Sequence, residues 1–224
     1  MKNRIASLLI LSALTLTVSC KNDKAAEAET TEAGAVKEAS GEAVSYTVDK
    51  GSSKIDWTGS KPTGKHTGTI NLSDGTVSIK DNVLDSGKFT IDMNTITVTD
   101  LKAGDGKEDL EGHLKGTGGK EEDFDHFFNV KKYPQSTFEI TKAVTENGKT
   151  SVEGNLTMKG ITKNVKFPAT VTVDGNTVTL VSDPFTINRT LWNVNYGSKS
   201  VFDNLGDKFI NDDIELKVSI TAKK

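Results

Sequence analysis

Apolar and polar residues alternate along most of this chain from Tyr46 to Lys224. The last segment is the clearest, with one apolar face made by Ile214, Leu216, Val218, Ile220 and Ala222. Successive side chains of a strand point to opposite faces, so each alternating segment has one face that must be buried. About eight to ten such segments, mostly joined by short turns, predict an all-β fold with antiparallel neighbours. The residues alone leave open a sandwich or a barrel, and closure into a barrel removes exposed edges.

Three local signals predict departures from straight strands. Asp74–Gly75 is a typical hairpin turn and lies between two alternating segments. The apolar positions change phase after Met93, which predicts a bulge or break near Asn94–Thr95. Pro168 interrupts another strand and requires an edge or a bulge, because proline has no N–H group to donate.

The segment from Asp100 to Pro134 breaks the alternation. Its stretches "GKEDLEGHLK" and "KEEDFDHFFNVKK" predict two short helices separated by "GTGG". In the second helix, Phe124, Phe127 and Phe128 would lie on one face, at positions i, i+3 and i+4. Such a stripe could cap one end of a barrel, either as a wall of a pocket or as plain core packing.

The N-terminal residues indicate export. Lys2 and Arg4 precede the uncharged run "IASLLILSALTLTV", which is too short for a membrane-spanning helix and typical of a signal peptide. The run ends at "TVSC", and Cys20 is the only cysteine, so no disulfide can form within the chain. The stretch resembles the lipobox of bacterial lipoproteins, which implies cleavage before Cys20 and lipidation of its sulfur. The alternative is an ordinary signal peptide with an incidental cysteine.

Three segments follow from this reading: a lipoprotein signal peptide (1–19), a disordered tether (20–44) and a β-domain (45–224). Residues 21–43 of the tether are rich in Ala, Glu, Thr, Gly and Lys and contain one large apolar residue, Val36. We expect it to remain disordered because it cannot bury enough apolar surface to offset the entropy of ordering.

Charge and motifs exclude several classes of function. The net charge is −3, and no cluster of Lys and Arg is interleaved with aromatic rings, so nucleic acid is not an expected partner. His66, His113 and His126 do not have metal-ligand spacing, and we predict no metal site or cofactor. No nucleophile motif or phosphate-binding loop is present, so we predict no catalytic residues.

Four stretches together resemble the YceI-like family. They are "YTVDKGSSKIDWTGSK" (46–61), "HFFNVKKYPQSTFEI" (126–140), "GNLTMKGITKNVKFPA" (154–169) and "FTINRTLWNVNYG" (185–197), in the order typical of the family. The resemblance implies a lipocalin-like antiparallel eight-stranded β-barrel with one or two short helices at one end. It also implies an elongated apolar cavity that binds a polyisoprenoid or a similar long-chain amphiphile. A barrel of about eight strands has room for one small ligand.

The chain departs from the family pattern in two ways. "GTGGKEE" separates the His113 region from the phenylalanine pair, an insertion that would reshape the loop over the barrel end. The lipobox would hold the domain at a membrane, whereas many relatives are soluble. Both departures bear on the identity of the ligand more than on the fold.

Arg189 is the only arginine outside the predicted signal peptide. Alternation with Ile187 and Leu191 would turn it inward, where it must be paired. It could contact a ligand phosphate or carboxylate, or form a salt bridge within the fold. His66 could bind a polar head group. The predicted ligand-binding residues are Trp57, His66, Phe89, Ile91, Met93, Phe124, Phe127, Phe128, Phe138, Leu156, Met158, Phe167, Ile187, Arg189 and Trp192.

The predicted function is non-catalytic binding or transport of a long-chain amphiphile, such as a polyisoprenoid or isoprenoid quinone. The predicted location is the envelope of a Gram-negative-type bacterium, with lipidated Cys20 holding the protein at the outer membrane, on its periplasmic side or at the cell surface. Two alternatives remain: an enzyme that acts on an isoprenoid or quinone-like substrate in the same cavity, and a packed barrel that only mediates protein contacts. The sequence does not indicate an oligomeric state.

Overall fold

The computed structural model describes residues 25–224. The predicted signal peptide and Cys20 lie outside the described residues. Within residues 25–224, none of the helices has the length and apolar character that a membrane crossing requires.

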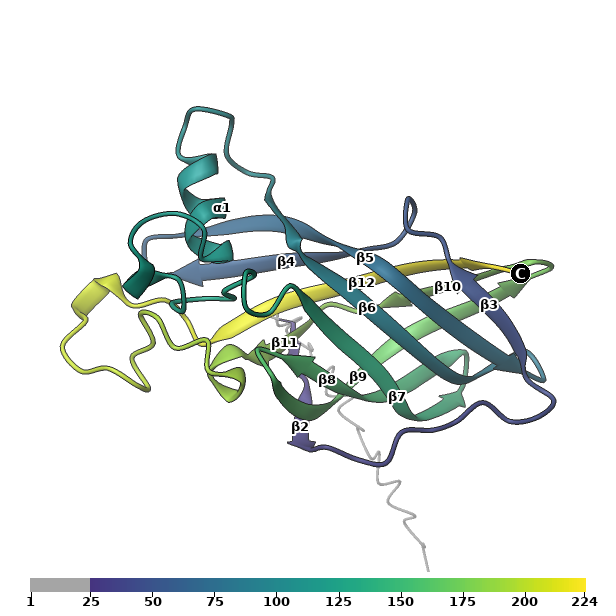
Figure 1. Ribbon diagram of the computed structural model, residues 1–224. Helices are drawn as coiled ribbons and strands as arrows, with labels where there is room; N and C mark the ends of the chain where they lie inside the picture. The colour runs from purple at the N-terminus through teal and green to yellow at the C-terminus, as the bar shows by residue number, and fades with distance from the viewer. Residues whose placement is uncertain (1–24) are drawn as a thin grey trace, which may run out of the picture.

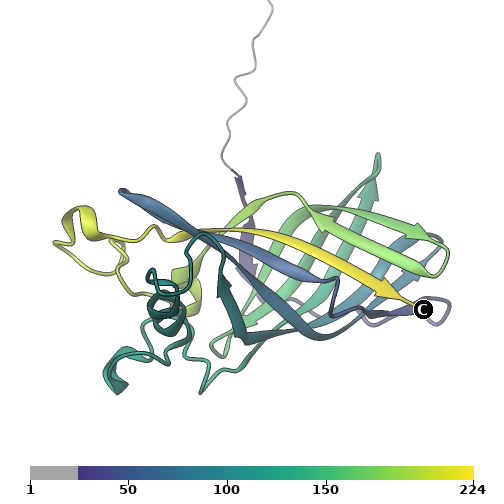
Figure 2. The same ribbon diagram turned by 90° about the horizontal axis from the view of Figure 1, so that it is seen from above.

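Eight strands form a closed antiparallel ring, in which each strand pairs with the next and the last returns to the first (Figures 1 and 2). The ring consists of β4 (Lys54–Lys61), β5 (Gly64–Lys80), β6 (Val83–Val98), β7 (Gln135–Glu146), β8 (Lys149–Met158), β9 (Ile161–Asp174), β10 (Thr177–Ser182) and β12 (Asp213–Lys223). The prediction of an all-β, eight-stranded antiparallel barrel is confirmed, and the choice between sandwich and barrel is decided by the pairing of β12 with β4.

The other elements complete the ring or cover its end. β3 (Val44–Val48) bridges β5 and β12, and β11 (Phe185–Asn188) continues the wall beside β12. Helix α1 (Lys107–Lys115) lies at one end of the barrel, and β3 lies towards the other (Figure 1). The single-turn helices are η1 (Glu121–Asp123), η2 (Arg189–Trp192) and η3 (Gly206–Lys208).

The alternation of the sequence becomes an inner and an outer surface of the wall. In β9, for example, Val165, Phe167 and Ala169 are buried, whereas Pro168 and Thr170 are exposed. The apolar core therefore lies inside the barrel, along its whole length.

The hairpin predicted at Asp74–Gly75 is wrong, because β5 continues through both residues. The register against β6 shifts between Leu72 and Asp74, so the pair forms a bulge. A Cβ atom on Gly75 would lie 2.8 Å from Val48, and the close approach of β3 explains the glycine. The bulge predicted near Asn94–Thr95 is confirmed by the register shift between Thr69 and Asn71, whose partners are Thr97 and Asp92.

The second predicted helix is also wrong, whereas α1 is confirmed. Only Glu121–Asp123 forms a single 3-10 turn, and hydrogen-bonded turns follow. The N–H groups of Phe128 and Val130 donate to the carbonyls of Leu114 and Lys115, at 3.1 and 2.8 Å. These donors satisfy the C-terminal carbonyls of α1, so they are not available for a helix of their own. The helical stripe of three phenylalanines therefore does not exist.

The disordered tether predicted for residues 20–44 is wrong for residues 25–44. β1 (Ala26–Glu27) and β2 (Glu29–Glu32) pair with the barrel wall. Further along, Gly34 exchanges two hydrogen bonds with the Asn155 side chain, at 2.9 and 2.7 Å. Backbone pairing and side-chain hydrogen bonds order this segment, and neither requires the large apolar side chains on which the prediction depended.

Candidate functional site: an apolar channel inside the barrel

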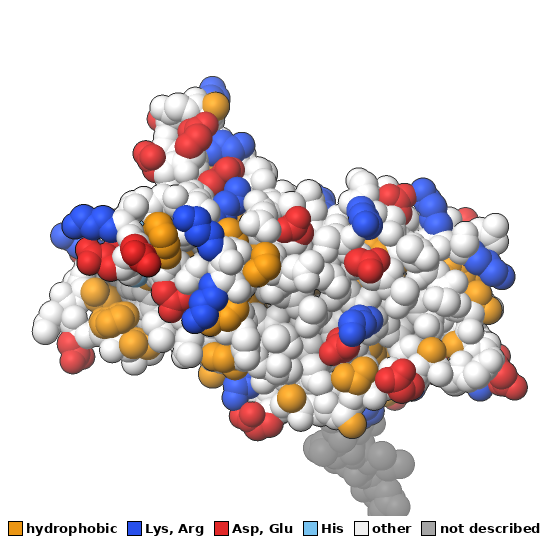
Figure 3. Space-filling model, in the orientation of Figure 1, with side chains coloured by type: hydrophobic (Ala, Val, Ile, Leu, Met, Phe, Trp, Pro, Cys, Tyr) orange, Lys and Arg blue, Asp and Glu red, His pale blue; other side chains and the backbone are white. Residues whose placement is uncertain are grey.

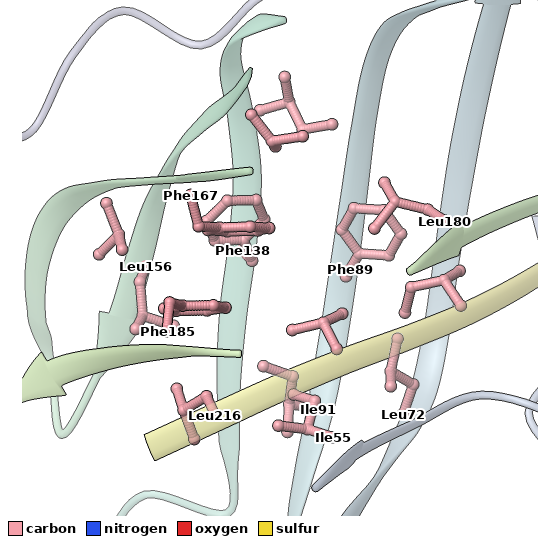
Figure 4. Close-up of a pocket in the computed structure, with 15 residues that line it drawn as sticks. Ile55, Leu72, Phe89, Ile91, Phe138, Leu156, Phe167, Leu180, Phe185 and Leu216 are labelled. Atoms are coloured by element: carbon pink, nitrogen blue, oxygen red, sulfur yellow. The ribbon is translucent and has the colours of Figure 1, made fainter. Parts of the chain in front are cut away.

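The inner part of the site is a cavity of about 70 Å³ with an entirely apolar lining. Figure 4 shows the rings of Phe89, Phe138, Phe167 and Phe185 around the same space, with leucine and isoleucine side chains from the surrounding strands. The lining residues are Ile55, Leu72, Phe89, Ile91, Phe138, Ile140, Val152, Leu156, Val165, Phe167, Leu180, Phe185, Leu216, Val218 and Ile220. We call this cavity the inner lobe.

A second cavity of about 120 Å³, the outer lobe, lies towards the end that α1 covers. Leu114 of α1 and the turn residues Phe127 and Phe128 line it, together with Ile210 and Asn211 from the loop before β12. The two lobes share Ile55, Ile91, Leu156 and Leu216, so they are adjacent along the barrel interior. We call the two lobes together the channel.

The structure brings most of the predicted site residues to this channel. Phe89, Phe138 and Phe167 line the inner lobe, Ile91 and Leu156 line both lobes, and the outer lobe has Trp57, Met93, Phe127, Phe128, Met158, Ile187 and Arg189. Contact of these residues with a ligand stays a prediction.

Three predicted residues do not line either lobe. Trp192 is fully buried in the core and donates from Nε1 to the Leu156 carbonyl, at 3.1 Å. Phe124 lies under the Lys131 ammonium, 4.5 Å from its ring centre, because the expected helix is absent. His66 lies outside both lobes, in a more open hollow of about 340 Å³ that shares Trp57, Leu114 and Phe127 with the outer lobe, and its Nδ1 is 2.9 Å from Asp100 Oδ2. The prediction that Trp192 and Phe124 line the cavity is wrong.

Sequence reasoning also missed several lining residues. Leu216 and Val218 face inward by the alternation already seen in the last strand, and Ser136 shares the parity of Phe138 in β7. Those three could have been found from the pattern. Ile210 and Asn211 come from an irregular loop, and no periodic signal marks them.

Two buried polar atoms of the outer lobe have no hydrogen-bond partner among residues 25–224. They are Trp57 Nε1 and Ser136 Oγ, in side chains that are 9% and 3% exposed. A buried polar group without a partner costs about 1–3 kcal/mol. The outer lobe can therefore hydrogen-bond a small polar group, whereas the inner lobe can accept only apolar groups.

Arg189 is 1% exposed and is held by the protein itself. β11 ends at Asn188, so Arg189 begins η2 and is not a strand residue. Its guanidinium donates to the carbonyls of Val194, Ile210 and Asn211, and Asp212 Oδ1 lies 3.7 Å away. Burial lowers the pKa of Arg189, and Asp212 opposes that shift. The contacts favour the structural alternative, because the guanidinium joins the segments on both sides of the 194–210 loop.

A cluster of rings packs outside the channel at the α1 end. His113 Nε2 and His126 Nδ1 lie 3.1 Å apart, the His126 ring stacks on Tyr196, and Phe127 contacts both His113 and Tyr196. Burial lowers the pKa of His113, the nearby His126 lowers it further, and Asp123 opposes both effects. Residues 25–224 contain no group of three or more His, Cys, Asp or Glu side chains arranged to hold a metal ion. The packed rings hold helix α1, which carries His113, against the turn of His126 and Phe127 and against Tyr196.

The surface at this end is also more apolar than elsewhere on the visible face (Figure 3). Leu191, Tyr196, Val201 and Phe202, all in the 189–210 segment, are exposed large apolar residues.

Comparison with known proteins gives three findings. A model of the YceI-like domain family matches residues 46–222. A UPF0312 protein of Yersinia pestis is 34% identical over 109 residues, which are 49% of this chain and 50% of that protein. A UPF0312 protein of Pectobacterium atrosepticum is 30% identical over 109 residues, again 49% of this chain and 50% of that protein. The chain thus spans about half the length of the curated relatives it matches.

Two solved structures have a similar fold. BcnA of Burkholderia cenocepacia has a TM-score of 0.60 and 24% identity, covering 79% of this chain and 99% of that one. A polyisoprenoid binding domain from Saccharophagus degradans, implicated in plant cell wall breakdown, has a TM-score of 0.55 and 15% identity, covering 80% and 97%. At these identities the likeness shows the fold.

Proposed function

Since this chain belongs to the YceI-like domain family, we propose that it binds a long-chain isoprenoid or a similar lipid inside the barrel, without chemical turnover. The observation that supports this proposal is the apolar channel, whose inner lobe has no polar side chain in its lining. Each Å² of apolar surface that leaves water contributes roughly 25 cal/mol, so a hydrocarbon tail would bind by burial alone. The named function of the polyisoprenoid binding domain from Saccharophagus degradans is consistent with such a ligand.

The shape and polarity of the channel narrow the class of ligand. Two small lobes in a row suit a flexible chain better than a wide, rigid ring system. The unpartnered Trp57 Nε1 can donate a hydrogen bond, and Ser136 Oγ can donate or accept one. We therefore propose that the tail lies in the inner lobe and a hydroxyl or carbonyl oxygen in the outer lobe. An isoprenoid alcohol or an isoprenoid quinone has this combination.

The lining of the channel supports the proposal that the ligand is bound without chemical turnover. Arg189 is the charged residue among the side chains that line the two lobes, and three backbone carbonyls already accept from it. A general acid or base must lie within hydrogen-bond reach of the reacting group, and the two lobes do not offer a carboxylate or an imidazole.

The test is organic extraction of the purified Cys20→Ser protein, followed by mass spectrometry. We expect about one intact long-chain lipid per protein, because a barrel of this size holds one small ligand. The same protein carrying Leu156→Trp, which fills the channel, is the matched control and should release none. If neither protein contains lipid, and prenyl alcohols and isoprenoid quinones also fail to bind, the proposal is wrong. Recovery of a chemically altered lipid after incubation would favour the enzyme instead.

We also propose that lipidated Cys20 holds the domain at the outer membrane of a Gram-negative-type envelope. The "TVSC" stretch after an apolar run supports this location. The Cys20→Ser change should move the protein from the membrane fraction to the soluble fraction, because dual acylation is what makes anchoring stable. Fractionation followed by immunoblotting measures this, with Ser19→Ala as a control that should stay in the membrane. A Cys20→Ser protein that remains membrane-bound would contradict the proposed anchor.

A further inference from the structure

The wall of the barrel has a seam between β9 and β11. β10 pairs with β9 only as far as Ser182 and Ala169, and Asp183 N then donates to the Pro168 carbonyl, at 3.0 Å. Beyond that point the chain continues as β11, which pairs with β12 and not with β9 among the described strands. Pro168 lies where β9 has lost its partner on that side, so the edge predicted for this proline is confirmed.

The N-terminal segment fills the seam. β2 pairs antiparallel with residues 163–166 of β9, and β1 pairs parallel with residues 185–186 of β11. Between them, Ala28 is 7% exposed and its N–H donates to the Thr186 carbonyl, at 2.8 Å. Residues 26–32, which we call the seam strand, therefore link β9 to β11. From β2 the chain runs along the outside of the barrel to β3 (Figure 1).

The seam borders directly on the channel. Val165 and Phe167 of β9 and Phe185 of β11 line the inner lobe, and Ile187 of β11 lines the outer lobe. The rings of Phe167 and Phe185 stack across the seam, with their centres 4.4 Å apart and their planes 1° from parallel. Removal of the seam strand would thus leave side chains of the channel itself as the barrier to solvent.

The seam strand is weakly attached compared with the rest of the wall. Its sequence is AEAETTE, and among these residues only Ala28 is buried. Two ion pairs hold its outer side, Glu29–Lys166 at 3.3 Å and Glu32–Lys163 at 2.6 Å. Exposed ion pairs contribute only about 0–1 kcal/mol each. Segments with few buried apolar contacts open locally at a small fraction of the global unfolding free energy.

We propose that the ligand enters and leaves sideways through the β9–β11 seam, with the seam strand as the gate. This inference rests on the proposed function and adds the route to it. At the α1 end the side chains of Leu114 and Phe127 lie between the outer lobe and the hollow of about 340 Å³, whereas the seam is closed mainly by backbone pairing. Peeling the seam strand away takes only Ala28 out of the core, and the stacked rings of Phe167 and Phe185 then separate to let the ligand pass.

The route also agrees with the proposed anchor. Four residues, 21–24, lie between Cys20 and Ala25, so five Cα-to-Cα steps join the two. A chain of five residues spans at most about 18 Å. A lipid on Cys20 would therefore keep the start of the seam strand within about 18 Å of the bilayer. A hydrocarbon ligand released there has a short path through water.

A reversible crosslink tests the gate. Glu29 and Lys166 are direct antiparallel partners on the outer face, a geometry whose Cα separation of about 4.5–5.5 Å suits a disulfide. In full-length Cys20→Ser protein, Glu29→Cys and Lys166→Cys provide the only two thiols. With a fluorescent prenyl alcohol as the probe, oxidation should slow transfer to phosphatidylcholine vesicles at least tenfold. Reduction should restore the rate, and the equilibrium affinity should change less than twofold.

The matched control is Lys88→Cys with Glu139→Cys, another ion-paired antiparallel couple on the outer wall, between β6 and β7. Its oxidation should leave the transfer rate unchanged. Conversely, Ala28→Asp places a charge at the buried position of the seam strand and should accelerate transfer at least fivefold. Equal transfer rates for oxidised and reduced Glu29→Cys/Lys166→Cys protein would overturn the gate while leaving ligand binding intact. A probe that fails to bind even the reduced protein would overturn both proposals.

Discussion

The Leu156→Trp variant is expected to bind a long apolar ligand at least a hundredfold more weakly than the native protein. Leu156 lines both lobes of the channel, so a larger indole at this position occupies space where the two lobes adjoin. A tail excluded from the inner lobe loses about 0.8 kcal/mol for each CH₂ group that stays in water. Four such groups correspond to about 3 kcal/mol, which is a factor of about 200 in the dissociation constant.

Fluorescence titration with a prenyl alcohol probe measures this loss, and thermal unfolding shows whether the variant is folded. The backbone of Leu156 pairs with Phe138 and Lys163, and its carbonyl accepts from Trp192; neither role depends on the side chain. Leu191→Trp is the matched control, because Leu191 is exposed and does not line the channel. Unchanged affinity in a folded Leu156→Trp protein would show that the channel is not the binding site.

Replacement of Arg189 by Met should lower the free energy of unfolding by about 3–5 kcal/mol, since it leaves buried carbonyls without a donor. The three carbonyls that accept from the guanidinium belong to Val194, Ile210 and Asn211. Methionine fills a similar volume without a donor, so the loss reports on hydrogen bonding rather than on a cavity. Lysine, a point charge on a flexible stem, cannot reproduce the planar fork and should recover only part of the loss.

Urea unfolding of the native, Arg189→Met and Arg189→Lys proteins measures this effect. Leu191→Ala, in the same turn but exposed, should change stability by no more than about 0.5 kcal/mol. A loss below about 1 kcal/mol in Arg189→Met would mean that water replaces the guanidinium. A large loss of ligand affinity without a loss of stability would instead support the ligand-binding alternative for Arg189.

The aromatic residues show how far the sequence carries the prediction of the site. Phe89, Phe138 and Phe167 lie in strands whose apolar and polar residues alternate, and each faces the channel as its parity predicts. Phe127 and Phe128 reach the outer lobe although the helix that was expected to carry them is absent. Phe124, whose placement depended entirely on that helix, lies under Lys131 instead. Periodicity is reliable where a ladder of hydrogen bonds imposes it, and it fails in segments whose donors serve a neighbouring element.

The N-terminal segment shows where amino-acid composition fails to predict structure. Its composition predicts disorder, because it has almost nothing apolar to bury. β9 and β11 nevertheless have unpaired edges at the seam, and residues 26–32 supply the missing partner. The prediction failed because every residue except proline has the same backbone donor and acceptor. Composition therefore does not indicate whether the backbone of a segment will pair with an open strand edge.

By itself the sequence determined an all-β domain, the inward and outward face of each strand, and the family to which the domain belongs, because these depend on local alternation and on short motifs. The tertiary structure decided three things: that β12 returns to β4 and closes the barrel, that Arg189 joins the ends of a loop, and that the N-terminal residues complete the wall. Each of these depends on which edges and carbonyls remain unpaired once the strands have assembled. That is a property of the assembled barrel and of no single stretch of the chain.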